Sequence, residues 1–333
     1  MSDPLNRLQG LSQGQSQGQS QGLVQGLQPA PPAPAVRLRL PPSGPRLLRV
    51  THETRYDYDA PVEVAHHSAW LRPRDTELQK VQRWDLQIEP LPDTAVQESE
   101  DAFHNWRHGF SHSRVHDRLM VTSRFQVLLS APPDLDSSLS PPWEEVARSL
   151  RYRAGVTQPD AVEFVLPSHF APHATELAAF AQDLFTPGRP LLEAAQALMT
   201  RVFVRMLYKP HSTDVATNAL QALAQGQGVC QDFAHLMLGL CRTHGIPARY
   251  VSGYFLNQHR LPGEIEASHA WIEVFIPGYG WKGYDPTHRR EADTRYVKIA
   301  VGRDYGDIRP VGGTFRGKGT RQMVVEVAVQ RVN

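Results

Sequence analysis

The clearest hydrophobic pattern of the chain lies between residues 230 and 276. Residues 233–241 are apolar on almost every side of a helix, and Gly245 and Pro247 end this pattern. A helix that is apolar all round is typical of the centre of a domain. The stretch 248–255 is rich in Tyr and Val, and 270–276 is largely apolar with a partial alternation. The pattern therefore predicts a buried helix followed by two β-strands.

Other periodic segments extend this arrangement. Pro277-Gly278-Tyr279-Gly280 predicts a turn that returns the chain through Trp281 to Asp285, in a strand antiparallel to 270–276. Helices are also predicted over residues 174–185 and 191–208, and strands over residues 81–88, 119–129 and 323–329.

Composition divides the chain into three parts. Residues 1–45 are repetitive and rich in Gln, Gly, Ser and Pro, so we expect a disordered tail. Residues 46–135 are strand-rich and predict a β-sandwich domain, whose end is marked by Pro141-Pro142 and a preceding proline pair. Residues 136–333 mix helices and strands and predict a second domain of the α+β class.

Charge and cysteine content narrow the function. The formal net charge of the 333 residues is +1, which gives no electrostatic reason to expect nucleic acid or anionic membranes as partners. We find no signal-peptide pattern and no apolar run long enough to span a bilayer, so the expected location is the cytoplasm. Two cysteines make no disulfide framework and suit a reducing compartment. The oligomeric state stays open.

Cys230 is the candidate nucleophile. Gly226 and Gly228 precede it and allow a sharp turn, which places Cys230 in the first turn of the buried helix. Free backbone N–H groups there favour a thiolate and can hold an oxyanion. A thiol also needs an imidazole within hydrogen-bonding reach to become a strong nucleophile.

His269 and Asp285 are the candidate partners of this thiol. His269 begins the strand 270–276, and Asp285 ends the strand that follows the turn. Since these strands are neighbours, the two side chains can lie side by side, with the imidazole facing the tip of the helix. Alone, each residue has an ordinary structural interpretation: Cys230 as a small core residue, His269 as a strand histidine and Asp285 as a turn residue.

Three motifs of this region resemble those of the bacterial transglutaminase-like family, whose catalytic domain has a papain-like core. The motifs are Gly228-Val229-Cys230-Gln231-Asp232-Phe233-Ala234-His235, Ser268-His269-Ala270-Trp271 and Tyr284-Asp285-Pro286-Thr287. The resemblance implies Cys230 as nucleophile, His269 as base and acid, and Asp285 as the group that orients His269. Further similar segments are 248–254 and Gly302-Arg303-Asp304-Tyr305.

The first part of the chain is similar to the β-rich N-terminal domain of one branch of that family. The matching segments are 48–58, Leu71-Arg72-Pro73-Arg74 and Asp101-Ala102-Phe103-His104-Asn105. His104 stands where that branch usually has Gly, so the turn there is expected to differ. The resemblance covers the chain from about residue 45 to the C-terminus.

The resemblance and the residues together predict a cysteine enzyme of acyl transfer that acts on a peptide or protein substrate. Hydrolysis, as in a peptidase or amidase, is the leading prediction. A transglutaminase, which transfers the acyl group to an amine, is the first alternative. A non-catalytic scaffold is the second. No cofactor and no metal ion are expected.

Several other residues receive mainly structural interpretations. Cys241 lies about 16 Å along the helix from Cys230, too far for a disulfide, and is expected in the core. His235 points to another helix face and is expected to be structural. Asp232, in the first turn, is expected to stabilise the helix dipole rather than to take part in catalysis. The histidines at four-residue intervals, His104, His108, His112 and His116, fit strands better than a metal-binding helix face.

Four positions keep two interpretations. Trp271 and Trp281 favour the core, but either can wall a substrate cleft. Tyr208, at the end of a predicted helix, is either a candidate donor to the oxyanion or an ordinary helix residue. Residues 302–305 fit either the rim of a cleft or an internal ion pair.

Overall fold

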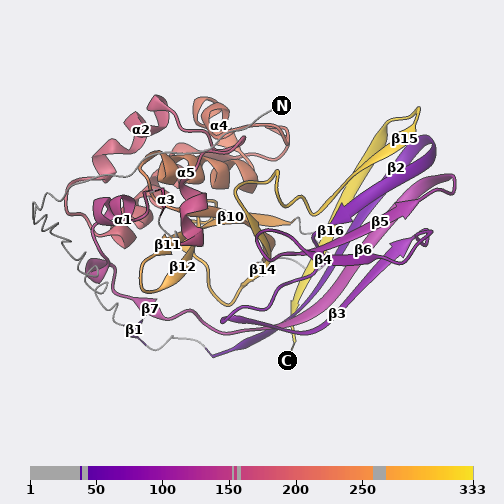
Figure 1. Cartoon of the computed structure of the whole chain (residues 1–333), viewed down its shortest axis with the longest axis horizontal. Helices are drawn as coiled ribbons and strands as arrows, with labels where there is room; N and C mark the ends of the chain where they lie inside the picture. The colour runs from indigo at the N-terminus through magenta and orange to yellow at the C-terminus, as the bar shows by residue number, and fades with distance from the viewer. Residues whose placement is uncertain (1–37, 40–43, 152–153, 156–158, 258–267, 333) are drawn as a thin grey trace, which may run out of the picture. The chain divides into compact units, whose positions relative to one another are not determined.

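The computed structural model describes residues 38–39, 44–151, 154–155, 159–257 and 268–332. It has the mixed α and β composition predicted from the sequence, with a β-rich N-terminal region and a papain-like part that contains the helices (Figure 1). Most of the predicted tail lies outside the described residues. Leu38–Arg39, inside that segment, form the short strand β1, which pairs with β7 (Asp134–Leu135).

The helical part is built around a five-stranded antiparallel sheet. Its strands follow the order β13 (Arg290–Glu291), β12 (Gly280–Asp285), β11 (His269–Ile276), β10 (Ala248–Phe255) and β14 (Tyr296–Gly302). The helices are α1 (Trp143–Ser149), α2 (Thr175–Ala181), α3 (Leu191–Arg205), α4 (Ala219–Gln225) and α5 (Cys230–Thr243), with 3₁₀ turns η1 (Ser137–Leu139), η2 (Asp160–Val165) and η3 (Gln182–Leu184).

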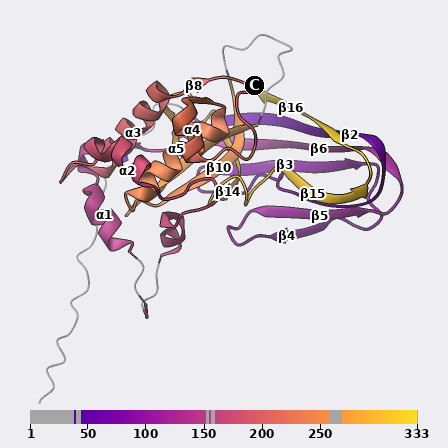
Figure 2. The ribbon, with the colours of Figure 1, turned by 90° about the horizontal axis from the view of Figure 1, so that it is seen from above.

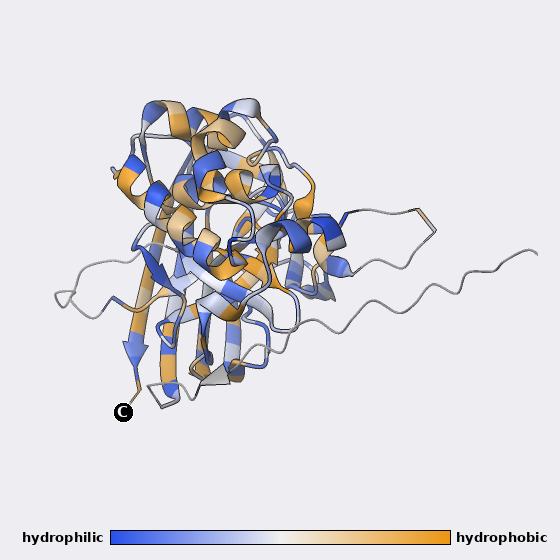
Figure 3. Ribbon diagram, turned by 90° about the vertical axis from the view of Figure 1, so that its left-hand side faces the viewer, coloured by the Kyte–Doolittle hydropathy of each residue, from blue (hydrophilic) through white to orange (hydrophobic). Residues whose placement is uncertain are grey.

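Helix α5 is the central rod that the sequence predicts. Its side chains from Phe233 to Cys241 are buried and pack on the apolar face of β11, which includes Ile272 and Val274. The other helices surround α5 on the same side of the sheet (Figure 1). In the hydropathy colouring of Figure 3, these helices carry both hydrophobic and hydrophilic segments, as expected for helices that bury one side.

Helix α3 ends earlier than predicted. It stops at Arg205, and Leu207–Tyr208 form the strand β8, which pairs in parallel with β9 (Gln227–Gly228). The N–H of Leu207 donates to the carbonyl of Gly226 at 2.9 Å. Backbone pairing with a segment twenty residues away therefore overrides the helical pattern, and Tyr208 lies outside the helix. Helix α2 is likewise shorter than 174–185 and continues as η3.

The β-rich region is one hydrogen-bonded sheet that folds back on itself. Its path is β3 (Gln79–Glu89), β6 (His116–Leu129), β2 (Arg46–Ala69), β5 (Trp106–His112) and β4 (Gln97–Glu100). The rings of Tyr56 and His67, both on β2, lie only 6.4 Å apart between centroids. Eleven residues of straight strand would span about 36 Å. The two halves of β2 therefore face each other and enclose an apolar cluster.

The last strands of the chain join this N-terminal sheet. Both β15 (Val311–Gly317) and β16 (Arg321–Arg331) pair with β2, and β16 is the strand predicted over residues 323–329 (Figure 2). This strand belongs to residues 136–333, the segment predicted as the second domain. In the structure its hydrogen bonds go to β2 instead, because β2 is long enough to pair with β6 and β16 over its first half and with β5 and β15 over its second.

Two buried amides connect the sheets. The side chain of Asn105 donates to the carbonyl of Val301 at 2.7 Å and accepts from its N–H at 2.8 Å, and Gln79 does the same with Lys298. Each amide makes the donor and acceptor contacts that a neighbouring strand would make with the backbone at the edge of β14. The adjacent His104 adopts a φ of 61°, the left-handed conformation that Gly favours. His104 therefore takes the conformation that a glycine at this position would favour.

Candidate active site

The N-terminus of α5 is held by a short turn and a buried carboxylate. Gly226 ends α4 with a φ of 65°, and Gly228 packs so closely on Asp232 that an added Cβ would lie 2.6 Å from its side chain. Asp232 accepts hydrogen bonds from the Val229 N–H (2.8 Å) and the Thr213 hydroxyl (2.6 Å). These contacts cap the helix and fix Cys230 as its first residue.

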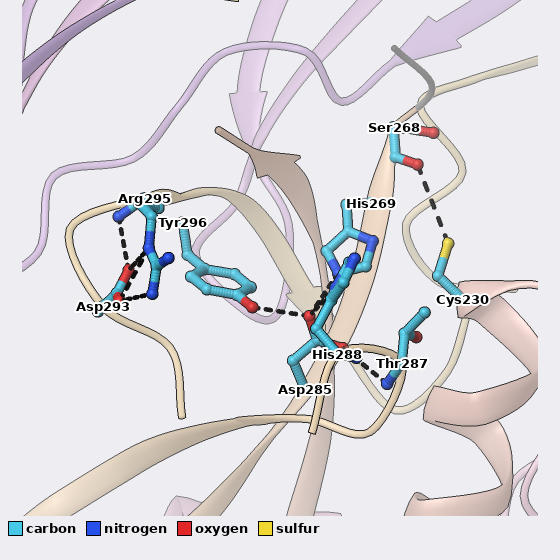
Figure 4. A network of polar contacts seen from close by, with 9 residues as sticks. All are labelled: Cys230, Ser268, His269, Asp285, Thr287, His288, Asp293, Arg295 and Tyr296. Atoms are coloured by element: carbon cyan, nitrogen blue, oxygen red, sulfur yellow. Dashed lines mark hydrogen bonds and ion pairs between the residues drawn. The ribbon is translucent and has the colours of Figure 1, made fainter. Parts of the chain in front are cut away.

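His269 and Asp285 meet as the strand pairing predicts. Nε2 of His269 donates to Oδ2 of Asp285 at 2.8 Å, and both side chains are buried. This leaves Nδ1 of His269 on the side of Cys230, as Figure 4 shows. The sulfur of Cys230 lies 4.0 Å from the carbonyl oxygen of Ser268, the residue that precedes His269 in the chain. The structure therefore brings together the three residues that the motifs single out.

The electrostatics of this pair favour an imidazolium. Burial by itself disfavours the charged ring, but the Asp285 carboxylate and the hydrogen bond with Cys230 outweigh it and raise the pKa of His269 to about 10. Burial likewise opposes ionisation of Asp285, yet His269 and His288 hold the pKa of this carboxyl far below its usual range. At neutral pH the two residues form a buried ion pair.

Asp285 has more partners than the sequence suggested. Its Oδ1 accepts the backbone N–H groups of Thr287 (2.8 Å) and His288 (3.2 Å). Its Oδ2 accepts, besides His269, Nδ1 of His288 (2.7 Å) and the hydroxyl of Tyr296 (2.7 Å). Burial and then the carboxylate raise the pKa of Tyr296, so the phenol remains a donor.

Sequence reasoning missed both His288 and Tyr296. His288 directly follows the Asp-Pro-Thr motif, and an imidazole three residues after a carboxylate at a turn was a usable signal. Tyr296 carried no such signal, because its contact depends on the pairing of β14 within the sheet. Figure 4 shows the two side chains reaching Asp285 from different directions.

Cys230 is half-buried at the wall of a cleft of about 710 Å³. The wall also contains the imidazoles of His269 and His288. The other described lining residues are Tyr208, Pro210, His211, Thr213, Val229, Gln231, Tyr250, Ser252, Phe255, Asn257, Ser268, Ala270, Tyr305 and Pro310. As the first residue of α5, Cys230 also offers a backbone N–H that has no acceptor within the helix. The cleft therefore brings together a thiol, a backbone N–H at a helix N-terminus and an imidazole.

The two tryptophans occupy another place. Trp271 is fully buried and stacks beside His269, with ring centroids 6.1 Å apart. Trp281 is half-buried and carries the guanidinium of Arg249 over its ring at 4.1 Å. Both line a separate cavity of about 100 Å³, and neither is among the described residues that line the cleft of Cys230. Their position agrees with the interpretation as packing residues.

Other candidate positions resolve into structural contacts. Cys241 is fully buried, and burial raises the pKa of its thiol to about 12. His235 is buried, its pKa is lowered to about 3 by burial, and its Nε2 accepts the Tyr305 N–H at 3.3 Å. The segment 302–305 fits the interpretation as a cleft rim better than that of an internal ion pair, because the Arg303 side chain is 44% exposed and its partner Asp307 lies outside the segment. Arg303 pairs with Asp307 at 2.9 Å, whereas Tyr305 lines the cleft.

One group in the described part of the chain has donor atoms arranged for a metal ion. The donor atoms of His269, Asp285 and His288 lie within 4.8 Å of one another. Hydrogen bonds already engage all three, so the arrangement is explained as a hydrogen-bond network. His112 ends β5 and His116 begins β6, and their ring centroids lie 5.1 Å apart, but among the described residues they belong to no such group.

Comparison with known families gives two matches. The family described as "Transglutaminase-like superfamily" matches residues 178–286, which contain Cys230, His269 and Asp285. The family described as "Bacterial transglutaminase-like N-terminal region" matches residues 48–128. In the described part of the chain, no helix is long and apolar enough to cross a membrane.

Relatives match over most of the chain. An uncharacterised protein of Mycobacterium tuberculosis is 34% identical over 308 residues, which cover 89% of this chain and 95% of that protein. An uncharacterised protein of Mycobacterium leprae is 34% identical over 86% of this chain and 99% of its own length. A solved structure from Cytophaga hutchinsonii, provisionally assigned as a cysteine protease, has a TM-score of 0.67 with 21% identity, over 87% of this chain and 93% of its own.

Proposed function

Because the chain belongs to the transglutaminase-like superfamily, we propose that it is a cysteine-dependent acyl-transfer enzyme that hydrolyses peptide or carboxamide bonds. One observation carries the proposal: the buried His269–Asp285 ion pair stands beside Cys230 at the N-terminus of α5. A scaffold would have no need to keep a charged carboxylate and imidazole buried at the wall of an open cleft.

The proposed reaction begins at the sulfur of Cys230. The imidazolium of His269 already holds the thiol proton, and the thiolate of Cys230 attacks the carbonyl carbon of the substrate. The backbone N–H of Cys230 stabilises the oxyanion of the tetrahedral intermediate. The C–N bond then breaks, and the imidazolium of His269 gives its proton to the departing amine. The product of this half-reaction is a thioester on Cys230.

In the second half-reaction, water attacks the thioester carbonyl and gives its proton to His269. The C–S bond breaks, the sulfur leaves as thiolate, and the product is a carboxylic acid. Asp285 keeps the Nε2 proton of His269 in place throughout, so that Nδ1 is free to accept and return the moving proton.

Hydrolysis is favoured over amine transfer by the composition of the cleft. A transferase must exclude water from the thioester, and aromatic walls serve that purpose. Trp271 and Trp281 line a different cavity. The Cys230 cleft has aromatic side chains of its own, Tyr208, Tyr250, Phe255 and Tyr305, but Tyr208 is 52% exposed and leaves the cleft open to water.

A transglutaminase is the second candidate. A protein-glutamine gamma-glutamyltransferase of Pseudomonas aeruginosa is 31% identical over 137 residues, which cover 37% of this chain and 19% of that enzyme. That likeness is partial, and it concerns a protein much longer than this chain.

A partition experiment tests the proposal. The protein is incubated with a library of glutamine-containing peptides and an excess of a labelled primary amine, and mass spectrometry measures free acid and amine adduct. We expect free acid to predominate and both products to vanish in Cys230→Ala. Predominance of adduct would replace the hydrolase by the transferase. Product formation by Cys230→Ala would refute the role of the cysteine.

A further inference from the structure

A second histidine contacts the same oxygen of Asp285 as His269. Nδ1 of His288 lies 2.7 Å from Oδ2 of Asp285, compared with 2.8 Å for Nε2 of His269. The backbone N–H of His288 reaches the other carboxylate oxygen at 3.2 Å. His288 therefore contacts both oxygens of the carboxylate that orients the proposed base.

His288 also lies between this carboxylate and the cleft. Asp285 has no exposed side-chain surface, whereas 39% of the His288 side chain is exposed and forms part of the cleft wall. The imidazole of His288 packs between the rings of Phe255, at 4.7 Å, and His269, at 5.0 Å. Through this position the ring shields the Asp285 carboxylate from water of the cleft, and a drier environment strengthens the ion pair of Asp285 with His269.

The geometry points to His288 as a positioning residue for the acyl-transfer reaction: it fixes the Asp285 carboxylate through Nδ1 and covers the His269–Asp285 pair with its ring. Tyr296 approaches the same oxygen from within the sheet, so the two donors together set the direction in which Oδ2 faces His269. His288 acts through Asp285 and needs no contact with the substrate. This inference rests on the proposed function.

The two contributions of His288 can be separated by substitution. His288→Phe keeps a planar ring as cover but has no donor. His288→Asn places an amide nitrogen where Nδ1 now lies, the same number of bonds from the backbone. His288→Gln is the matched control, because its amide nitrogen lies one bond farther, near the position of Nε2. All three keep the backbone N–H that binds the second carboxylate oxygen.

The experiment measures kcat and KM for an activated ester, p-nitrophenyl acetate, together with the rate of Cys230 alkylation by iodoacetamide and the melting temperature. We expect His288→Phe to lower kcat about tenfold, the effect of one charge-assisted hydrogen bond, with KM unchanged. His288→Asn restores kcat to within about threefold of the wild type, and His288→Gln does not. Alkylation of Cys230 follows the same order.

Two results would overturn the inference. A wild-type kcat in His288→Phe would show that the donor is unnecessary, and equal values for His288→Asn and His288→Gln would show that its position has no effect. If His288 were purely structural, the variants with lower kcat would also have lower melting temperatures. Equal melting temperatures with unequal kcat values support a positioning role. If wild-type ester hydrolysis does not depend on Cys230, the proposed function fails instead, and this is checked first with Cys230→Ala.

Discussion

Asp285→Asn is the substitution whose effect the structure specifies in most detail. The amide oxygen of Asn can keep the two backbone N–H groups that Oδ1 now accepts. Its NH₂ group then faces Nε2 of His269, which must become an acceptor. The imidazole proton moves to Nδ1, on the side of Cys230, and the ring can no longer take the thiol proton. We expect kcat to fall about 10⁴-fold, as the same change does in serine proteases.

The same substitution has a calculable effect on stability. The pKa of His269 is about 10 in the folded protein and 6.5 in an unfolded chain. The folded state therefore holds an extra proton between these values, and stability from this pair is full below pH 6.5 and is lost as the pH rises through about 10. Each pH unit in this window is worth about 1.4 kcal/mol, or about 4 to 5 kcal/mol in all.

Urea unfolding of both proteins across pH 6.5 to about 10 measures this contribution. The wild type should lose unfolding free energy steadily relative to Asp285→Asn, because groups common to both proteins cancel in the difference. A difference in unfolding free energy that stays constant over this pH range would refute the ion pair. A fall in kcat that merely matches the loss of folded protein would make Asp285 a structural residue.

Three further changes test other parts of the structure. Tyr296→Phe removes a hydroxyl donor to Asp285, so kcat should fall about tenfold and urea unfolding should show a loss of about 1.5–3 kcal/mol. Burial lowers the pKa of His52 to about 4, so the stability contributed by this residue is full above pH 6.5 and is lost as the pH falls towards 4. Urea unfolding of His52→Gln should therefore show a shallower loss of unfolding free energy over that range, by about 1.4 kcal/mol per pH unit. In Gly253→Ala the new Cβ would lie 2.0 Å from a carbonyl oxygen of the neighbouring strand, so calorimetry should show a loss of at least about 2 kcal/mol, whereas Gly44→Ala, with open space around it, should change little. An unchanged kcat or stability in Tyr296→Phe, an unchanged pH dependence of stability in His52→Gln, or an unchanged stability in Gly253→Ala would contradict the contact described for that residue.

The local elements around the site could be predicted from the sequence because their signals are local. The apolar run between the turn at Gly228 and Gly245 contained the helix α5, and the strand at 248–255 has the bounds that its pattern indicates. The order Cys230, His269, Asp285 on a helix and two paired strands also placed these side chains near one another. In each case the pattern and the observed contacts arise from the same short segment.

The remaining features depend on contacts between distant segments. The apolar stretch at residues 323–329 indicates a strand but does not identify its partner, which is β2 some 270 residues earlier. Tyr208 left its predicted helix for the same reason, since β9 offers it backbone partners. The hydroxyl of Tyr296 reaches Asp285 only because β14 folds back along β10. Periodicity carries no information on such pairings.

The central claim is that Cys230 forms a covalent acyl intermediate with the help of His269. Brief reaction of the protein with p-nitrophenyl acetate, acid quenching and peptide mass spectrometry test it directly. In the wild type we predict one acetyl group, on the peptide that contains Cys230. In His269→Ala we predict far less acetylation of this peptide, and in Cys230→Ala none at that position. An acetyl group on Cys241, on another residue in preference to Cys230, or unchanged acetylation of Cys230 in His269→Ala would contradict the account.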